Sequence, residues 1–233
     1  MKCGKWLNSV FLRTDQENRQ KIIEIMDKNP NAMFLDCGCS NGFFSGEIAD
    51  AIGTGLIYGI DFQAENCNNG DIEICKTDLN KAFPFQDEVF DVVHANQVIE
   101  HLSGSDSFIK EIYRVLKPGG YAVISTPNLG SLHNIISLIF GYQPFSAHVS
   151  NEVIVGNPLD PKNRMKHTTP GEIHLRVFSY KGLKELAEYH GFVTEAVYGI
   201  GFYPFPKNFG RIFAKIDPRH SVYLTARLLK PLE

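Results

Sequence analysis

Short apolar runs alternate with segments of helical periodicity along the first half of the chain. Apolar runs of strand length predict strands at 32–36, 56–61, 72–76, 90–95 and 120–125. Apolar residues spaced three to four apart predict helices over 42–52, 104–116 and 179–190. Because strands and helices alternate, we predict an α/β fold with a doubly wound parallel sheet. The ligand crevice of such a sheet lies at the carboxyl ends of its strands.

The N-terminal region predicts a helix at 15–29, which is amphipathic, has an acidic start and ends at an Asn-Pro stop. An apolar segment precedes it, formed by Trp6, Leu7, Val10 and Phe11. Two roles fit this segment. It either covers the ligand cleft or packs on the sheet.

The C-terminal third departs from simple alternation. Residues 192–201 and 221–229 are both strand-like, and the segment between them contains Pro204, Pro206 and Pro218. That segment has room for one brief helix but not for a full crossover connection. We therefore predict that the two strands pair antiparallel.

Residues 129–177 interrupt the α/β pattern. A helix with an apolar face is predicted at 129–141, and a long irregular piece follows it up to 171. Irregular segments of this length in a compact domain are usually functional or disordered. We expect a single domain over 1–233, in which 129–177 is a lid-like insertion and 141–171 closes over the substrate. The alternative is a mobile surface insertion.

Composition excludes several classes of protein. A chain of 233 residues can bury one sizeable core, and its formal charge of −3 provides no general attraction to nucleic acid. The N-terminus lacks the apolar core of a signal peptide, and the apolar stretch 135–140 is far too short to span a membrane. The five cysteines are odd in number and do not resemble a disulfide framework. These features predict a reduced cytoplasmic protein.

The segment 32–42 carries the most informative motif. An apolar run ends in Asp36, and a turn containing Gly38 and Gly42 leads into a helical pattern. Glycine is needed where a loop turns sharply and a ligand approaches the backbone. Cys37 and Cys39 suit this turn as small buried residues, since no second pair at metal-ligand spacing accompanies them. The motif predicts a site for a nucleotide-like cofactor.

The charges near this motif distinguish between cofactors. Asp61 and Asp78 stand at further predicted strand ends, so three carboxylates including Asp36 surround one site. Carboxylates favour a ligand with ribose hydroxyls, an amino group and positive charge, and they disfavour an anionic pyrophosphate. S-adenosyl-L-methionine has these features and no phosphate.

The chain resembles the class I S-adenosylmethionine-dependent methyltransferases, in the broad group that acts mostly on small molecules. The matching segments are 34–42, 58–62, 78–79, 90–102 and 115–128, with a weaker match at 178–192. The resemblance implies a Rossmann-like seven-stranded sheet in the order 3-2-1-4-5-7-6, whose last strand is antiparallel and lies beside the fifth. Without the resemblance, the residues predict only the C-terminal hairpin.

The resemblance also implies a set of cofactor-binding residues. Asp61 is expected to accept hydrogen bonds from the ribose, Phe62 to pack on the adenine, and Asp78 with Leu79 to bind the adenine amino edge. For Asp61 a helix cap remains an alternative, and for Asp78 a turn remains one. The remaining expected contacts are the loop residues and two polar residues facing the methionine moiety: Asp36, Cys37, Gly38, Cys39, Gly42, Asn96 and Gln97.

Glu100 and His101 resemble part of a Glu-x-x-Glu-His pattern, which binds a metal ion in some methyltransferases. Gln97 occupies the position of the first carboxylate, and a neutral amide compensates a divalent cation poorly. We therefore expect no metal ion in the reaction. His101 is the candidate catalytic residue, as a general base or acceptor contact, and the alternative is a hydrogen-bonded structural histidine.

Four residues of the insertion are candidates for contact with the acceptor: Tyr142, Phe145, His174 and Arg176. Related proteins carry a similar His-x-Arg-x-Phe stretch that returns toward the active site. A structural role for His174 is an equal alternative. Ser179, just after this stretch, is the predicted N-cap of the following helix.

The function implied is methyl transfer from S-adenosyl-L-methionine to an oxygen, nitrogen or carbon atom of a small-molecule or glycan-type acceptor. Neither nucleic acid nor a membrane span is expected to take part. Two alternatives remain open. One is a nicotinamide-linked oxidoreductase on a Rossmann fold, and the other is a non-catalytic protein that binds S-adenosylmethionine.

Overall fold

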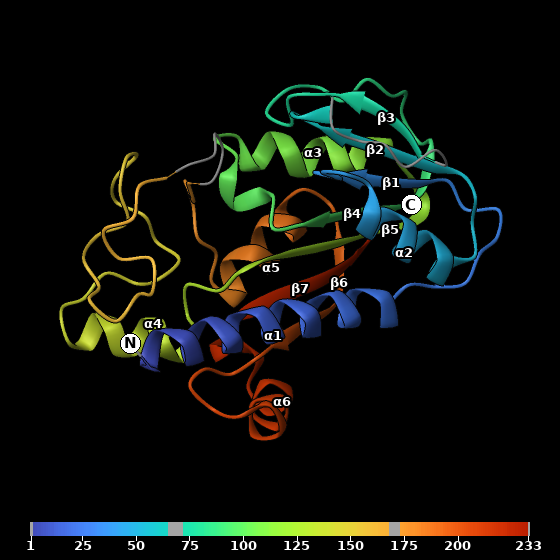
Figure 1. Cartoon of the computed structure of the whole chain (residues 1–233). Coiled ribbons are helices and arrows are strands. Elements are labelled where there is room, and N and C mark those ends of the chain that lie inside the picture. The colour runs from blue at the N-terminus through green and yellow to red at the C-terminus, as the bar shows by residue number, and fades with distance from the viewer. Residues whose placement is uncertain (1, 65–71, 168–172, 233) are drawn as a thin grey trace.

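The computed structural model of the chain describes residues 2–64, 72–167 and 173–232, and their side chains from residue 12 onward. Seven strands form one sheet in the order β3-β2-β1-β4-β5-β7-β6 (Figure 1). β1 to β5 are parallel to one another, and β7 is antiparallel to both β5 and β6. The predicted fold, strand order and antiparallel hairpin are confirmed. The strands are β1 (Phe34–Cys37), β2 (Ile57–Asp61), β3 (Ile72–Lys76), β4 (Phe90–Asn96), β5 (Leu116–Pro127), β6 (Val193–Ile200) and β7 (Tyr223–Leu229).

Helices cover both faces of the sheet, as expected for a doubly wound fold (Figure 1). Apolar residues of α1 and α2 form one core with one face of the central strands, and those of α3 and α5 form a second core on the opposite face. No helix of the described chain combines the length and apolarity needed to cross a membrane. The helices are α1 (Lys2–Glu24), α2 (Phe43–Ile52), α3 (Ser105–Val115), α4 (Leu132–Ile139), α5 (Tyr180–Tyr189) and α6 (Lys207–Ile216), with short 3₁₀ turns η2 (Ile99–His101) and η3 (Pro218–His220).

The N-terminal helix differs from its prediction at both ends. α1 begins at Lys2, so the apolar segment before residue 15 is part of the same helix, and it ends at Glu24 instead of Asn29. Tertiary contacts explain the early end: Arg227 donates to the backbone oxygen of Ile25, and Asp27 N donates to Tyr121 Oη at 2.9 Å. The side-chain contacts of residues 2–11 lie outside the described part of the chain.

The first helix of the insertion begins later than predicted. α4 starts at Leu132 instead of residue 129, because Leu129 N donates to Phe178 O at 2.9 Å and thereby joins the returning end of the insertion. α6 is the brief helix predicted between the last two strands. At α5 the predicted N-cap is confirmed, because the Ser179 hydroxyl accepts a hydrogen bond from Gly182 N at 3.2 Å.

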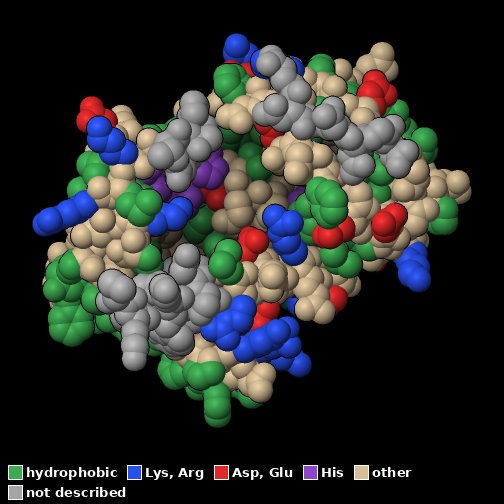
Figure 2. All heavy atoms as spheres, viewed as in Figure 1, with side chains coloured by type: hydrophobic (Ala, Val, Ile, Leu, Met, Phe, Trp, Pro, Cys, Tyr) green, Lys and Arg blue, Asp and Glu red, His purple; other side chains and the backbone are tan. Residues whose placement is uncertain are grey.

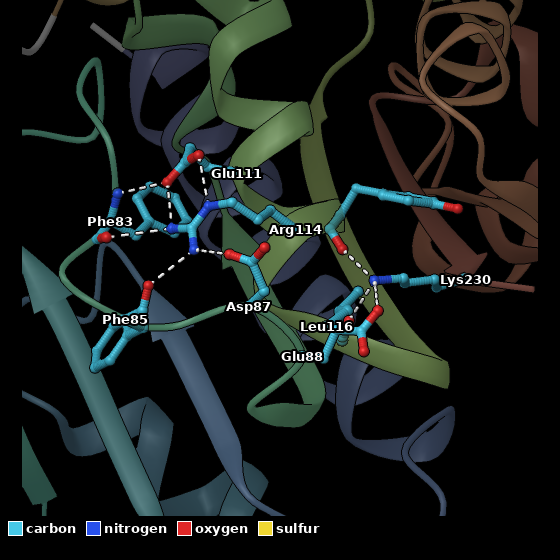
Figure 3. A network of polar contacts seen from close by, with 9 residues as sticks. Phe83, Phe85, Asp87, Glu88, Glu111, Arg114, Leu116 and Lys230 are labelled. Carbon is cyan, nitrogen blue, oxygen red and sulfur yellow. Dashed lines mark hydrogen bonds and ion pairs between the residues drawn. The ribbon is translucent and has the colours of Figure 1, made fainter.

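A partly buried ionic network fixes α3 against the chain that leads into β4 (Figure 3). Arg114 donates to both carboxylate oxygens of Glu111 at 2.9 and 2.7 Å and to Asp87 at 2.7 Å. The same guanidinium donates to the backbone oxygens of Phe83 and Phe85 at 3.2 and 2.8 Å. One side chain therefore satisfies acceptors on two separate segments.

Replacing Arg114 by leucine is expected to lower the free energy of unfolding by about 2 kcal/mol, because several partly buried acceptors lose their charged donor together. Arg114 lowers the pKa of Glu111, so this contribution is present above about pH 4.3 and is lost as the pH falls through the folded-state value. Urea unfolding at pH 7 and pH 3 measures both effects. The control is Lys184→Leu, which removes one exposed ion pair to Glu188. Equal effects of the two variants would contradict the role of the network.

Candidate cofactor and acceptor site

The loop after β1 has the backbone that its glycines predict. Gly38 and Gly42 adopt positive φ angles of 78° and 73°, and Gly42 immediately precedes α2. A Cβ built on Gly38 would lie 2.4 Å from Cγ2 of Val98. Gly38 N donates to Ile60 O at 2.7 Å, which holds the loop against β2. A side chain at Gly38 would therefore be strained and would fill the space beside the loop.

The Asp36 carboxylate is buried and is held by two side chains of other elements. Its Oδ2 accepts from the Ser45 hydroxyl at 2.5 Å, and its Oδ1 lies 2.7 Å from His94 Nδ1. Asp36 is 3% exposed. The Asp36 side chain supports the loop from α2 and β4, and it is not part of the cavity lining that contains Asp61 and Asp78.

Cys37 and Cys39 are packing residues of the loop. Both are buried, and burial raises the pKa of the Cys37 thiol. Cys39 lies over Gly59 of β2, where an added Cβ would be 2.7 Å from the Cys39 sulfur. Neither cysteine lines a described cavity, so any contact they make with a cofactor is through the backbone.

A cavity of about 560 Å³ opens at the carboxyl ends of β1, β2 and β4. It brings together seven of the expected cofactor residues: Gly38, Asp61, Phe62, Asp78, Leu79, Asn96 and Gln97. Its described lining contains two carboxylates and no lysine or arginine, so it suits a neutral or cationic ligand. Sequence reasoning missed six lining residues, which follow the expected ones in the same loops: Ser40, Asn41, Gln63, Asn80, Val98 and Leu102.

Asp61 connects the end of β2 to the glycine loop. Its Oδ2 accepts from Ser40 N at 2.9 Å, and its Oδ1 accepts from Gln63 N at 2.7 Å. Ser40 has a positive φ of 50°, which is unusual for a residue with a side chain. The carboxylate therefore holds the rim of the cavity in shape, and each of its oxygens has further capacity to accept a hydrogen bond.

Asp78 is the second carboxylate of the cavity. Hydrogen bonds from the backbone and side-chain nitrogens of Asn80, at 3.0 and 3.1 Å, lower the pKa of Asp78. The side chain therefore forms the turn that was the alternative for this position, while it also lines the cavity.

Buried polar residues support the floor of the site. Asn18 of α1 donates to Asn96 Oδ1 at 2.9 Å and accepts from the hydroxyls of Ser125 and Thr225 at 3.1 and 2.7 Å. Gln97 has a positive φ of 57°, and strained backbone of this kind is common at functional sites. The amphipathic pattern of α1 does not reveal the role of Asn18, because its partners come from distant strands.

A second cavity, of about 510 Å³, lies between α1, the end of β5 and the insertion. Gln97 and His101 line both cavities, so they form the wall between them. Figure 2 shows histidine side chains in the hollow beside the insertion. The second cavity is lined by Leu12, Asp15, Gln97, His101, Pro127, Asn128, His133, Asn134, Phe145, Ser146, His148, Ile154, Asp160, Pro161, Lys162, His174, Val222 and Tyr223.

The four expected acceptor residues divide into two pairs. Phe145 and His174 line the second cavity, and Tyr142 and Arg176 do not. Arg176 instead donates to Leu102 O at 2.9 Å, which makes it an anchor for the returning insertion. Residues 168–171 of the expected lid lie outside the described residues.

Glu100 and His101 form η2 between the two cavities. Glu100 is fully buried, and burial raises its pKa to about 8. Its Oε2 accepts from the Thr126 hydroxyl at 3.0 Å. His101 Nδ1 lies 3.1 Å from the Ile173 carbonyl oxygen, and because a carbonyl only accepts, the ring proton is on Nδ1. His101 Nε2 is therefore the basic nitrogen.

Two further histidines of the second cavity are uncharged at neutral pH. Burial lowers the pKa of His133 and of His174 to about 4 in each case. The ring of His174 is 4.9 Å from that of His101 and stacks on that of His148 at 4.8 Å. His133 and His148 had no distinguishing sequence context, and only the folding of the insertion brings them to the site.

Comparison with known proteins agrees with the fold. A family described as "Methyltransferase domain" matches residues 35–124. The demethylmenaquinone methyltransferase of Lactobacillus johnsonii is 27% identical over 197 residues, covering 79% of this chain and 78% of that protein. The mitochondrial ubiquinone biosynthesis O-methyltransferase of Mus musculus is 30% identical over 183 residues. That match covers 73% of this chain and 44% of the mouse protein, so the chain spans less than half of that relative.

A solved S-adenosylmethionine-dependent methyltransferase from Mesorhizobium loti has the same fold, with a TM-score of 0.58 and 15% identity. The superposition covers 90% of this chain and 95% of that one. Together with the cavity at the glycine loop, these matches define an enzyme that uses S-adenosyl-L-methionine. The matched family, the named relatives and the shared fold support a class I S-adenosylmethionine-dependent methyltransferase.

Proposed function

We propose that the chain methylates a hydroxyl group of a small, partly apolar acceptor that binds in the second cavity. The observation that carries this proposal is the wall of Gln97 and His101, which the two cavities share. A reactive group of an acceptor bound in the second cavity, next to Gln97 and His101, therefore lies close to the cofactor cavity. The reaction therefore needs no large rearrangement of the sheet.

The lining of the second cavity supports this class of acceptor. Leu12, Phe145 and Ile154 offer apolar contact, while asparagine and histidine side chains offer hydrogen bonds. The relatives named above act, by their names, on demethylmenaquinone and in ubiquinone biosynthesis. Of these two names, that of the mouse relative specifies O-methylation, and it supports a hydroxyl as the accepting group.

The residues have separable roles in this proposal. Bound S-adenosyl-L-methionine supplies an already activated methyl group on its sulfonium. Asp61 holds the ribose, and the glycine loop lets the backbone approach the ligand. His101 Nε2 accepts the proton of the acceptor hydroxyl, since Nδ1 is held by Ile173 O. The rest of the rate enhancement comes from alignment of the two reactants.

A direct test combines calorimetry with a methyl-transfer screen. S-adenosylhomocysteine should bind, nicotinamide dinucleotides should not, and mass spectrometry should find a product heavier by one methylene on an oxygen. The oxidoreductase alternative receives no support from the matched family. Cofactor binding without transfer to any acceptor in a broad screen would favour the non-catalytic alternative.

The insertion is expected to close over the acceptor. Amides within 141–167 should exchange with solvent at least about tenfold more slowly when S-adenosylhomocysteine and the acceptor are both bound, because closure buries their hydrogen bonds. Hydrogen exchange read by mass spectrometry measures this change. The internal control is α3, which packs on the sheet face opposite to α1 and α2 and whose amide exchange should not change. Equal exchange in the free and the ternary state would make the insertion a passive surface feature.

Methyl transfer is expected to need no metal ion, because Gln97 replaces a carboxylate and the sulfonium needs no electrophilic help. Turnover should not fall after treatment with EDTA, and added Mg²⁺ should not raise it. The comparison uses the same enzyme before and after chelation. Loss of turnover on chelation, with recovery on adding a divalent ion, would contradict this expectation.

A further inference from the structure

Three possible metal ligands converge where η2 meets the end of the insertion. One ligand atom each from Glu100, His101 and His174 lies within 4.8 Å of the other two. The insertion is fastened at this point, because Leu175 N and Arg176 N donate to Glu100 O at 2.7 and 3.2 Å. A residue more than seventy positions along the chain is thereby held beside the Glu-His pair.

Both imidazole rings are oriented as metal-binding histidines are. His101 Nδ1 lies 3.1 Å from Ile173 O, and His174 Nδ1 lies 2.8 Å from Ser146 O. Each carbonyl fixes the proton on Nδ1, which leaves the lone pair on Nε2. Hydrogen bonds of this kind from the second nitrogen orient histidine ligands in metalloproteins.

The third group is a carboxylate oxygen that the described residues do not satisfy. Oε1 of Glu100 is buried and accepts no hydrogen bond within the described part of the chain. A buried polar atom in this state is costly and calls for a partner. Oε1 lies 3.9 Å from His101 Nε2, which is too long for a hydrogen bond. Two metal–ligand bonds of about 2.1 Å each would span this distance.

We propose that Glu100, His101 and His174 bind a divalent transition-metal ion of the Zn²⁺ type. Two imidazole nitrogens and one carboxylate suit such ions, whereas Mg²⁺ and Ca²⁺ prefer all-oxygen sites. The site differs from the Glu-x-x-Glu-His pattern, because Gln97 stands in place of the first carboxylate and His174 of the insertion supplies the third ligand. Side-chain rotations must bring the ligand atoms to about 3.3 Å apart for a tetrahedral ion.

The bound ion has a consequence that rests on the proposed function. It occupies His101 Nε2, the nitrogen assigned to take the acceptor proton, and it connects η2 to the insertion. Zn²⁺ therefore inhibits methyl transfer, which itself proceeds without metal. The free enzyme is the active form, and metal binding removes the base of the acceptor site.

Metal binding is tested on the full chain without cofactor or acceptor. The purified protein is stripped with EDTA, dialysed and titrated with Zn²⁺ in competition with a chromophoric chelator. One ion per chain is expected, and His174→Ala and Glu100→Gln should each weaken the affinity by at least about tenfold. Glu100→Gln keeps an oxygen that can accept from the Thr126 hydroxyl, so it is expected to fold. It therefore tests the site even if His174→Ala fails to fold. The control is His220→Ala, which removes a surface histidine paired with Asp217.

The outcomes separate the two proposals. Tight binding of one ion that is lost in both ligand variants and kept in His220→Ala supports the site, whether or not methyl transfer has been found. Absence of binding, or equal affinity in all four proteins, overturns it. If Zn²⁺ binds as expected but leaves turnover unchanged, the result supports the metal site and contradicts the role of His101 as general base.

Discussion

Replacing His101 by glutamine is expected to lower kcat by a factor of about 10²–10⁴, the usual contribution of a general base. Nδ1 of His101 is held by Ile173 O, so Nε2 is the nitrogen that can accept a proton between the two cavities. Glutamine has a similar shape but no basic nitrogen. The dissociation constant of S-adenosylhomocysteine should change much less than kcat, because the expected ribose and adenine contacts are made by Asp61, Phe62 and Asp78 and not by His101.

A purely structural role for His101 would give a different pattern. An acceptor whose hydroxyl is more acidic needs less help from a base, so the loss in kcat should shrink as acceptor acidity rises. A packing defect would instead lower kcat by the same factor for every acceptor. His220→Gln, at the surface, is the matched control and should keep the rate of the parent enzyme. A constant loss across acceptors would rule out the base.

The fold could be predicted from the chain because local pattern and tertiary structure agree. The segment around Asp36 shows a buried strand, a turn that needs positive φ and a helix, and all three occur there. The ends of α1 could not be predicted in the same way. The contacts of Tyr121 and Arg227 end the helix, and these residues lie 94 and 202 positions along the chain from their partners.

The cofactor side of the site was easier to predict than the acceptor side. Asp61 and Asp78 stand at the ends of regular strands, so the sheet itself brings them together. The acceptor side depends on the irregular insertion, where no periodicity shows which side chains point inward. His133 and His148 reach the cavity through loop contacts alone. The side-chain partners of Asp36 could not be predicted, because Ser45 and His94 lie on separate elements.

Replacing Asp61 by alanine is expected to weaken cofactor binding by about 1.5–3 kcal/mol, the range for a hydrogen bond to a charged group. This corresponds to roughly 10–150-fold in the dissociation constant. Asp61 lines the cofactor cavity and receives hydrogen bonds from Ser40 N and Gln63 N, so the change removes a ligand contact and loosens the rim together. Calorimetry with S-adenosylhomocysteine measures the effect, and Asp50→Ala, an exposed carboxylate on α2, is the control.

The two effects of Asp61 can be separated with Asp61→Asn. The amide oxygen still accepts from one backbone nitrogen of the rim, while the negative charge that favours the ribose hydroxyls and a cationic sulfonium is gone. If the charge matters most, Asp61→Asn should lose nearly as much cofactor affinity as Asp61→Ala. Its loss of affinity should be larger for S-adenosylmethionine, which carries a positive sulfonium, than for S-adenosylhomocysteine, whose sulfur is neutral. If the shape of the loop matters most, Asp61→Asn should bind S-adenosylhomocysteine with almost the affinity of the parent protein. Unchanged affinity in both variants would mean that Asp61 holds only the loop, and another residue must then bind the ribose.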